Sequence, residues 1–104
     1  MTEEQKVYKE YKDNNVVFIG DKPLINYATS VVMNFTTKNV NNVIIKSRGK
    51  FISKAVDVSQ VAINRFLKDQ VELGDVKIGS EEFVNKEGRN VRVSFVEITI
   101  KKKI

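Results

Sequence analysis

The pattern of apolar and polar positions predicts two strand–helix units in the first two thirds of the chain. Short continuous apolar runs over 15–20 and 43–46 are typical of buried strands. Apolar residues recur at helical spacing over 23–37 and over 52–67, so each strand is followed by a helix. Because crossovers between parallel strands are right-handed, both helices are expected on one side of a mixed sheet.

From Val71 onward the apolar period becomes two, which predicts two long strands joined as a hairpin. The phase of this alternation changes at Gly74, a suitable place for a β-bulge. The hairpin turn falls at 85–90, where Gly88 can adopt a positive φ. The last strand, 91–101, would span roughly 35 Å at ~3.4 Å per residue, so the tip is expected to project. The predicted element order is β-α-β-α-β-β.

The same pattern predicts which helix faces are buried. At the start of the first helix, Asp21 is expected to cap the free amides, and Pro23 is compatible with the first turn. Predicted core positions of this helix are Leu24, Ile25, Ala28, Val31, Val32 and Phe35, opposite an uncharged face of Asn26, Ser30, Met33, Asn34 and Thr37. Those of the second helix are Ile52, Ala55, Val56, Ser59, Ala62, Ile63 and Phe66. Val58 and Val61 lie outside this second stripe, which indicates burial on two sides and hence self-association.

The composition predicts one soluble domain that lacks the usual means of catalysis. The 104 residues, 41% hydrophobic and 30% charged, favour a globular domain over 14–104. Residues 1–13 are interpreted as a flexible arm, with a short docked helix as the alternative. The absence of Cys and His excludes thiolate and imidazole chemistry, and scattered carboxylates offer no metal site. No phosphate-binding glycine loop or nucleophile motif occurs, so we expect no enzyme, cofactor or small-molecule substrate. Without an apolar run of membrane-spanning length, a cytoplasmic protein is favoured.

The net charge of +5 is unevenly distributed along the chain. Residues 1–21 carry −2, 22–56 carry +6 with no acid at all, 57–82 carry −3, and 83–104 carry +4. A surface without a binding role normally mixes its signs, whereas segregated basic blocks are the footprint of a polyanionic partner. Lysine-rich segments that only aid solubility are the alternative, and composition alone leaves both open.

The first candidate site lies where the second strand meets the second helix. Lys46, Arg48 and Lys50 gather at this junction, and Lys54 follows one helical turn later. Free amides at a helix N-terminus attract phosphate, and these cations strengthen that attraction. Lys22 occupies the equivalent turn of the first strand–helix unit. Because parallel strands bring both turns to the same sheet edge, Lys22, Arg48 and Lys50 are expected to converge.

The hairpin is a second candidate site. Lys86, Arg89 and Arg92 surround its tip. Slender β arms with arginine can enter the narrow groove of a nucleic acid. The alternative is a hairpin kept basic only to discourage pairing of its exposed edge.

Four segments carry a specific similarity to a known family. They are NVVFIGDKPLINY (15–27), VIIKSRGKFISKAVD (43–57), NRFL (64–67) and VKIGSEEFVNKEGRNVRVSFVEITIKK (76–102). On these segments, which cover nearly everything from Asn15 onward, the sequence resembles the Alba family, the small basic chromatin proteins of archaea.

The resemblance implies an α+β, two-layer sandwich with sheet order 1-2-4-3 and a long hairpin between the last two strands. It implies a dimer, either a homodimer or a heterodimer with a family paralogue. It further implies binding to double-stranded DNA with little sequence preference, compaction of the chromosome, and binding to RNA. The protein would then be cytoplasmic and chromosome-associated.

The resemblance also implies roles for individual residues. Lys22, Arg48, Lys50 and, more loosely, Arg89 match family contacts to nucleic acid. Arg65, Phe66 and Leu67 match a segment that joins neighbouring dimers along DNA, although core packing would equally explain Phe66. Many members have two lysines before the proline, the first of which can be acetylated to weaken binding. Asp21 stands at that position here, so this control is impossible. Its negative charge should also weaken DNA binding.

Two other functions remain open from the sequence. The chain could bind chiefly RNA, as a ribonucleoprotein partner. It could also be a scaffold for an acidic protein, in which case Phe66 and the uncharged helix face would matter more than Lys22 and Arg48.

Overall fold

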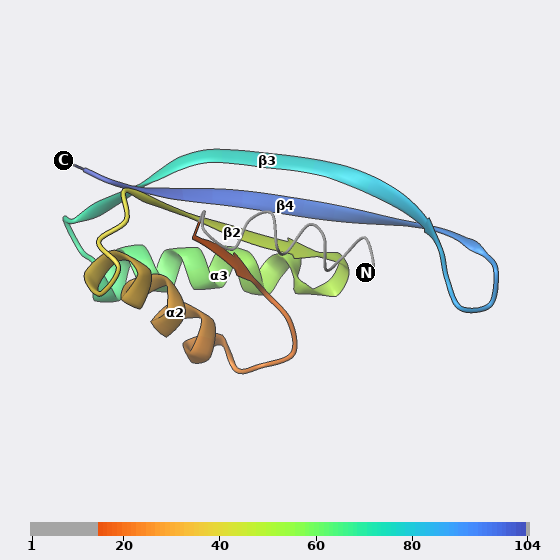
Figure 1. Cartoon of the computed structure of the whole chain (residues 1–104), viewed down its shortest axis with the longest axis horizontal. Coiled ribbons are helices and arrows are strands. Elements are labelled where there is room, and N and C mark those ends of the chain that lie inside the picture. Colours follow the sequence, from red (N-terminus) through yellow and green to blue (C-terminus); the bar gives the residue numbers. More distant parts are fainter. Residues whose placement is uncertain (1–14, 104) are drawn as a thin grey trace.

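The computed structural model describes residues 15–103, which form a mixed four-stranded sheet with two helices on one face (Figure 1). The sheet has the order β1-β2-β4-β3, in which β1 and β2 are parallel and the other pairs antiparallel. The predicted α+β architecture and sheet order are confirmed, while the arm predicted over 1–13 lies outside the described residues. The elements are β1 (Val16–Phe18), α2 (Leu24–Thr36), β2 (Asn42–Arg48), the 3-10 turn η1 (Gly49–Phe51), α3 (Ile52–Val61), the π-helical η2 (Ala62–Phe66), β3 (Val71–Val84) and β4 (Asn90–Lys102).

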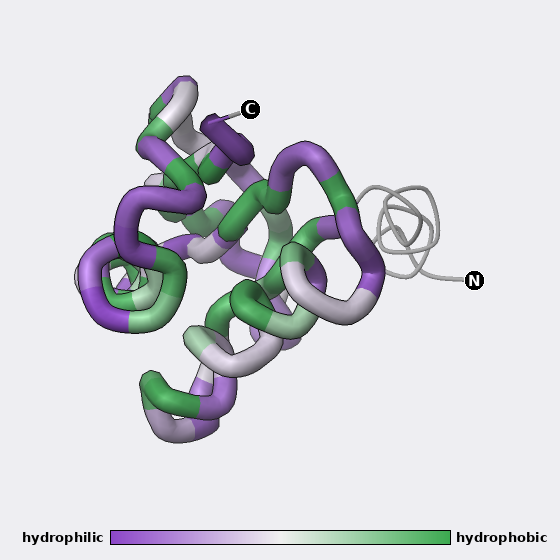
Figure 2. The backbone as a smooth tube through the Cα atoms, turned by 90° about the vertical axis from the view of Figure 1, so that its left-hand side faces the viewer, coloured by the Kyte–Doolittle hydropathy of each residue, from purple (hydrophilic) through white to green (hydrophobic). Residues whose placement is uncertain are grey.

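The core lies between the helices and the two central strands. On β4, Val96, Ile98 and Ile100 alternate with partly exposed residues and are buried beneath the helices. Val43 and Ile45 do the same on β2. Figure 2, viewed along the long axis, shows hydrophobic and hydrophilic residues alternating along the chain in both layers. The period-two and helical patterns therefore each direct one face inward.

The start of α2 differs from its sequence prediction. Its N-cap is Pro23, and no side chain caps the helix, so the predicted Asp21 cap is wrong. The hydroxyl of Tyr27 instead accepts hydrogen bonds from the backbone N–H groups of Gly20 (2.9 Å) and Lys22 (3.1 Å). This aromatic side chain reaches back from the first turns of α2, so the amides of the preceding loop find an acceptor without a capping residue.

The buried face of α2 is shifted relative to the predicted one. Ile25, predicted in the core, is exposed. Asn34, predicted on the outer face, is buried, and its Nδ2 donates a hydrogen bond to the Ser30 carbonyl (3.0 Å). This back-bond satisfies the side-chain nitrogen alone, since the buried Asn34 Oδ1 has no hydrogen-bond partner among the described residues.

The second helix also packs on a different flank than predicted. Val58 is fully buried, whereas Val56 and Phe66 are exposed. The predicted helix over 52–67 changes at Ala62 into a π-helical turn, in which the Leu67 N–H bonds to the Ala62 carbonyl (2.9 Å). This wider turn places one more residue in the helix and rotates Phe66 out of the apolar stripe. Val58 is thus buried within the chain itself and does not support self-association, which stays a prediction.

The hairpin has the features predicted for it. The register between β3 and β4 shifts between Leu73 and Val76, which confirms the bulge near Gly74. In the turn, Gly88 has a φ of +79°. The Asn85 side-chain oxygen accepts hydrogen bonds from the N–H groups of Glu87 and Arg89. The arm projects well beyond the helices in Figure 1, and the molecule measures 47 × 26 × 24 Å.

Candidate nucleic-acid interface

Two loops that carry cations meet at one edge of the sheet. β1 and β2 run parallel, with Phe18 opposite Lys46, so the loops that follow them leave the sheet at the same edge. The ammonium group of Lys54, on α3, donates hydrogen bonds to the carbonyls of Gly20 (2.7 Å) and Lys22 (2.9 Å). A side chain from the second strand–helix unit thus holds the loop of the first in place.

Lys54 therefore has a different environment from the other predicted contact residues. Besides its two carbonyl partners, its ammonium nitrogen lies 5.8 Å from the Tyr27 ring centroid and 5.4 Å from that of Phe51. Both distances are within the range of cation–π attraction. The hydrogen bonds to the loop carbonyls make Lys54 a positioning residue, although its charge still adds to the local positive potential.

Lys22, Arg48 and Lys50, named here the turn cluster, are exposed around this edge. Arg48 ends β2 on the sheet face away from the helices, and one guanidinium nitrogen lies 3.9 Å from a carboxylate oxygen of Glu81. The nitrogen of Lys50 is 5.3 Å from the Phe51 ring centroid. An ion pair this long and this exposed contributes little, so the Arg48 guanidinium remains available to an external anion.

Gly49 is required where β2 turns into η1. Its φ is +62°, a conformation that costs an ordinary residue about 1–2 kcal/mol. A Cβ at this position would also lie 3.3 Å from a methyl group of Val93. The glycine thus lets the chain turn sharply into the first helical amides, which have no acceptor within the helix.

Lys46 is less accessible than the sequence suggests. Its ammonium group pairs with Glu97 on the adjacent strand β4 (3.4 Å), and only 13% of its side chain is exposed. Cross-strand pairing between opposite charges stabilises the sheet. Lys46 therefore contributes charge behind the turn cluster rather than an exposed contact.

The cations of the hairpin form a second group, Lys86, Arg89 and Arg92, named here the tip cluster. Lys86 and Arg89 are exposed in the turn. Arg92 forms an ion pair with Glu82 (3.3 Å) and donates a hydrogen bond to the Ser80 hydroxyl (3.3 Å). The hairpin tip and the start of α3 lie toward the same end of the long axis (Figure 1).

The segment predicted to join dimers is only partly on the surface. Phe66 is 45% exposed and Arg65 is exposed, while Leu67 is 2% exposed and packs in the core. Core packing thus does not account for Phe66, and it does account for Leu67. An interface at this place would use Arg65 and Phe66, with Leu67 anchoring the segment from beneath.

Sequence reasoning missed Tyr27, Glu81, Phe83 and Phe95. A helical tyrosine one turn after the loop was a usable signal, because a half-buried hydroxyl needs a hydrogen-bond partner. Phe83 and Phe95 fall in the outward phase of the alternation, which also could have been noticed. Glu81 became meaningful only once the register placed it near Arg48.

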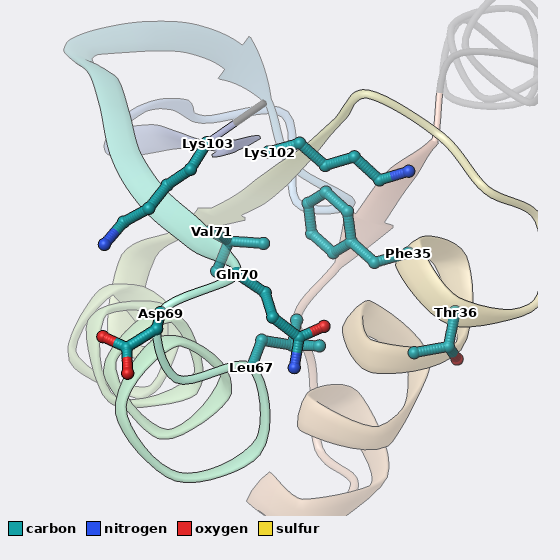
Figure 3. A pocket seen from close by; sticks show the side chains of 8 residues that line it. All are labelled: Phe35, Thr36, Leu67, Asp69, Gln70, Val71, Lys102 and Lys103. Atoms are coloured by element: carbon teal, nitrogen blue, oxygen red, sulfur yellow. The ribbon is translucent and has the colours of Figure 1, made fainter.

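A hollow of about 370 Å³ lies away from both clusters, between the end of α2 and the start of β3 (Figure 3). The ammonium groups of Lys102 and Lys103 point in different directions there, and the former bonds to Asn39. Residues 15–103 contain no group of three or more His, Cys, Asp or Glu placed to hold a metal ion. Within the same residues, no helix is long and apolar enough to cross a membrane.

The family model and the curated proteins that match this chain carry the same description. The family model described as Alba matches residues 15–80. A "DNA/RNA-binding protein Alba" from Nanoarchaeum equitans is 51% identical over 88 residues, covering 84% of this chain and 97% of that protein. Another protein of that name, from Methanococcus maripaludis, is 35% identical over 87 residues, covering 84% and 97%.

Solved structures of similar fold agree with these relatives. "Alba from Thermoplasma volcanium" has a TM-score of 0.76 and 38% sequence identity, covering 84% of this chain and 99% of its own. ALBA1 from Trypanosoma brucei has a TM-score of 0.62 over 85% of this chain and 68% of its own. At 19% identity, this second likeness concerns the fold alone.

Proposed function

This chain belongs to the Alba family, and we propose that it binds double-stranded DNA, and RNA, through the phosphate backbone, as a dimer. The observation that carries the proposal is the turn cluster. Its three exposed cations lie in the β1–α2 loop (Lys22), at the end of β2 (Arg48) and in η1 (Lys50), and Lys54 in the first turn of α3 binds the Lys22 carbonyl. Curated relatives with 51% and 35% identity are named DNA/RNA-binding proteins, which agrees with a polyanionic ligand.

Phosphate binding follows from the chemistry of the turn cluster. Arg48 can offer two parallel N–H donors to one phosphate. The first amides of η1 and α3, which follow Arg48 in the chain, add a partial positive charge nearby. Lys22 adds a charge from the neighbouring loop that Lys54 holds in place. None of these groups reads a base edge, so affinity should depend strongly on salt and weakly on sequence.

The hairpin extends this surface. Lys86 and Arg89 are exposed at the tip of the slender β3–β4 arm, which suits a groove beside the backbone bound by the turn cluster. Asp21, exposed beside Lys22, opposes phosphate and should lower the affinity.

An exposed apolar surface on the edge strand β3 supports the dimer. Leu73, Val76 and Ile78 of β3 pair with the buried Ile100, Ile98 and Val96 of β4, and so share the helix-facing side of the sheet. Their side chains are nevertheless exposed, 78% in the case of Ile78. Val56 adds an exposed apolar side chain on α3.

The apolar side chains on the helix-facing side of β3 thus extend the hydrophobic core to the surface. Such a surface is expected where a second copy of the chain, or a paralogue, covers it. A single-chain mass by light scattering, at the concentrations used for binding, would contradict the dimer.

Chromosome association follows if bound dimers pack side by side. Arg65 and Phe66 form an exposed pair at the end of the second helix that suits this contact. A chromatin protein of this kind would coat DNA and compact it without a preferred site.

The test of the proposed function is the double variant Arg48→Ala/Lys50→Ala, titrated against duplexes of unrelated sequence over a range of salt. Each lost phosphate contact should flatten the slope of log affinity against log salt by about 0.9. Affinity for all sequences should fall alike. Lys38→Ala, which removes an exposed lysine just after α2, is the matched control. Unchanged binding by the double variant, or loss confined to one sequence, would contradict backbone recognition by the turn cluster.

A further inference from the structure

The sheet face away from the helices carries aromatic rings beside Arg48. The strand register places Arg48, Phe95 and Gly79 opposite one another on β2, β4 and β3. Phe83 lies four residues beyond Gly79 on β3 and therefore on the same face. The neighbours of Phe95 along β4 that point the other way, such as Val96, are buried in the core. Both rings thus face outward, on the surface that the helices do not cover.

The Phe95 ring is held in place by the sheet itself. A Cβ added at Gly79 would lie 2.6 Å and 2.8 Å from two of its ring atoms. The far edge of the ring therefore lies over the backbone of β3, where only glycine leaves room. This contact keeps the ring spread over the strand pair, while part of it stays exposed. A ring fixed in this way loses little freedom when a ligand packs on it.

Arg48 connects the two rings. It pairs in register with Phe95, and its side chain crosses β4 so that the guanidinium carbon lies 5.9 Å from the Phe83 ring centroid. The Phe83 side chain is 44% exposed. Two aromatic rings and one guanidinium group thus follow one another along the outer face, next to the turn cluster.

Planar groups beside cations match the chemistry of unpaired nucleobases. Bases of a single strand stack on aromatic rings and on guanidinium planes, while their phosphates bind the cations alongside. Bases inside a duplex are already stacked on each other and cannot reach an open sheet face. We propose that Phe83 and Phe95 form a stacking subsite for unpaired bases of single-stranded RNA or DNA. This proposal rests on the proposed function, the binding of nucleic acid.

The charges on this face permit such a ligand. Two acidic side chains lie on this face near the rings, and each is paired with a cation: Glu81 with Arg48, and Glu97 with Lys46. Arg48 is shared between the turn cluster and the stacking subsite. Substitution of Arg48 should therefore weaken the binding of both duplexes and single strands, whereas loss of the rings should weaken the binding of single strands alone.

The test compares Phe83→Leu, Phe95→Leu and the double variant, with fluorescence anisotropy of labelled oligouridine, oligothymidine and a mixed-sequence duplex. Leucine keeps an apolar side chain but removes the ring. Each substitution should weaken single-strand binding about tenfold, because the loss of one base–ring stacking contact lowers affinity by about this factor. Duplex binding should change less than about twofold. The two single-stranded probes separate an RNA ligand from a general single-strand ligand.

Two further variants keep the test interpretable. Phe83→Tyr and Phe95→Tyr retain the ring and should restore most of the single-strand affinity. Met33→Ala removes an apolar side chain exposed on α2 and should change neither affinity. Equal losses for duplex and single strands, or no loss for either, would overturn the stacking subsite. Failure of the parent chain to bind any nucleic acid would instead overturn the proposed function.

Discussion

The two basic regions of this protein present their charges in different ways. The turn cluster depends on a tertiary contact, because Lys54 of α3 anchors the β1–α2 loop that carries Lys22, while the Tyr27 hydroxyl accepts hydrogen bonds from amides of the same loop. The tip cluster sits on a hairpin whose turn is stabilised locally, by Asn85 and a positive φ at Gly88. Charge presentation in the first region therefore depends on the fold as a whole. In the second it depends only on a few neighbouring residues.

The largest effect is expected from Lys54→Met, which keeps most of the side-chain volume and removes the ammonium group. Two carbonyls in the β1–α2 loop lose their donor. One hydrogen bond to a charged group contributes roughly 1.5–3 kcal/mol, and only the bond to the Gly20 carbonyl is partly buried, while that to Lys22 is exposed. The free energy of unfolding should thus fall by about 2 kcal/mol in chemical denaturation. Duplex affinity should fall as well, because the Lys22 loop loses its anchor.

Lys101→Met is the matched control, since it removes an equal charge from an exposed position on β4. A loss of stability and affinity as large in this control as in Lys54→Met would mean that overall charge, and not the anchored loop, accounts for the result.

The two glycines with positive φ provide a smaller and more direct comparison. Gly49 has a φ of +62° and Gly88 a φ of +79°, so an alanine at either position costs about 1–2 kcal/mol in backbone strain. At Gly49 the added Cβ would also press on Val93, whereas at Gly88 it would meet nothing within 4 Å.

We therefore expect Gly49→Ala to lower the thermal midpoint more than Gly88→Ala, and to weaken duplex binding in proportion to the distortion of the turn. Gly88→Ala should affect only the hairpin tip, as measured by local amide exchange. Equal stability losses would show that the two turns are equally independent of the core.

The sequence predicted the elements that follow from periodicity better than those that follow from packing. The hairpin, the bulge near Gly74 and the turn at Gly88 are local, and all were predicted correctly. The buried flank of α3 was not, because Val56 and Val58 lie on opposite sides of the stripe formed by Ala55, Ser59 and Ala62, and only the packing against the sheet buries Val58 and leaves Val56 exposed. The π-helical turn at Ala62 then rotated Phe66 outward, and no sequence signal gave warning of it.

The candidate site shows the same division. Positive charge at the two loops was readable from the acid-free block over 22–56. That Lys54 would bind backbone carbonyls, and that Lys46 would pair with Glu97, depended on strand register and on the reach of side chains. The net charge of a segment follows from its sequence and can be predicted, whereas the division into contact residues and supporting residues depends on packing.

The smallest effect concerns the place where the two regions meet, the ion pair between Arg48 of the turn cluster and Glu81 at the base of the arm. The pair is long and exposed, so Glu81→Gln should leave stability unchanged within about 0.5 kcal/mol. It should raise duplex affinity about twofold to threefold, since Arg48 no longer exchanges a carboxylate for a phosphate.

Glu87→Gln removes the same charge from the exposed hairpin turn, away from Arg48. If the ion pair restrains Arg48, the gain at Glu81 exceeds that at Glu87 in salt-dependent titrations. Equal gains would mean that only net charge matters, and that the arm and the turn cluster act on nucleic acid independently.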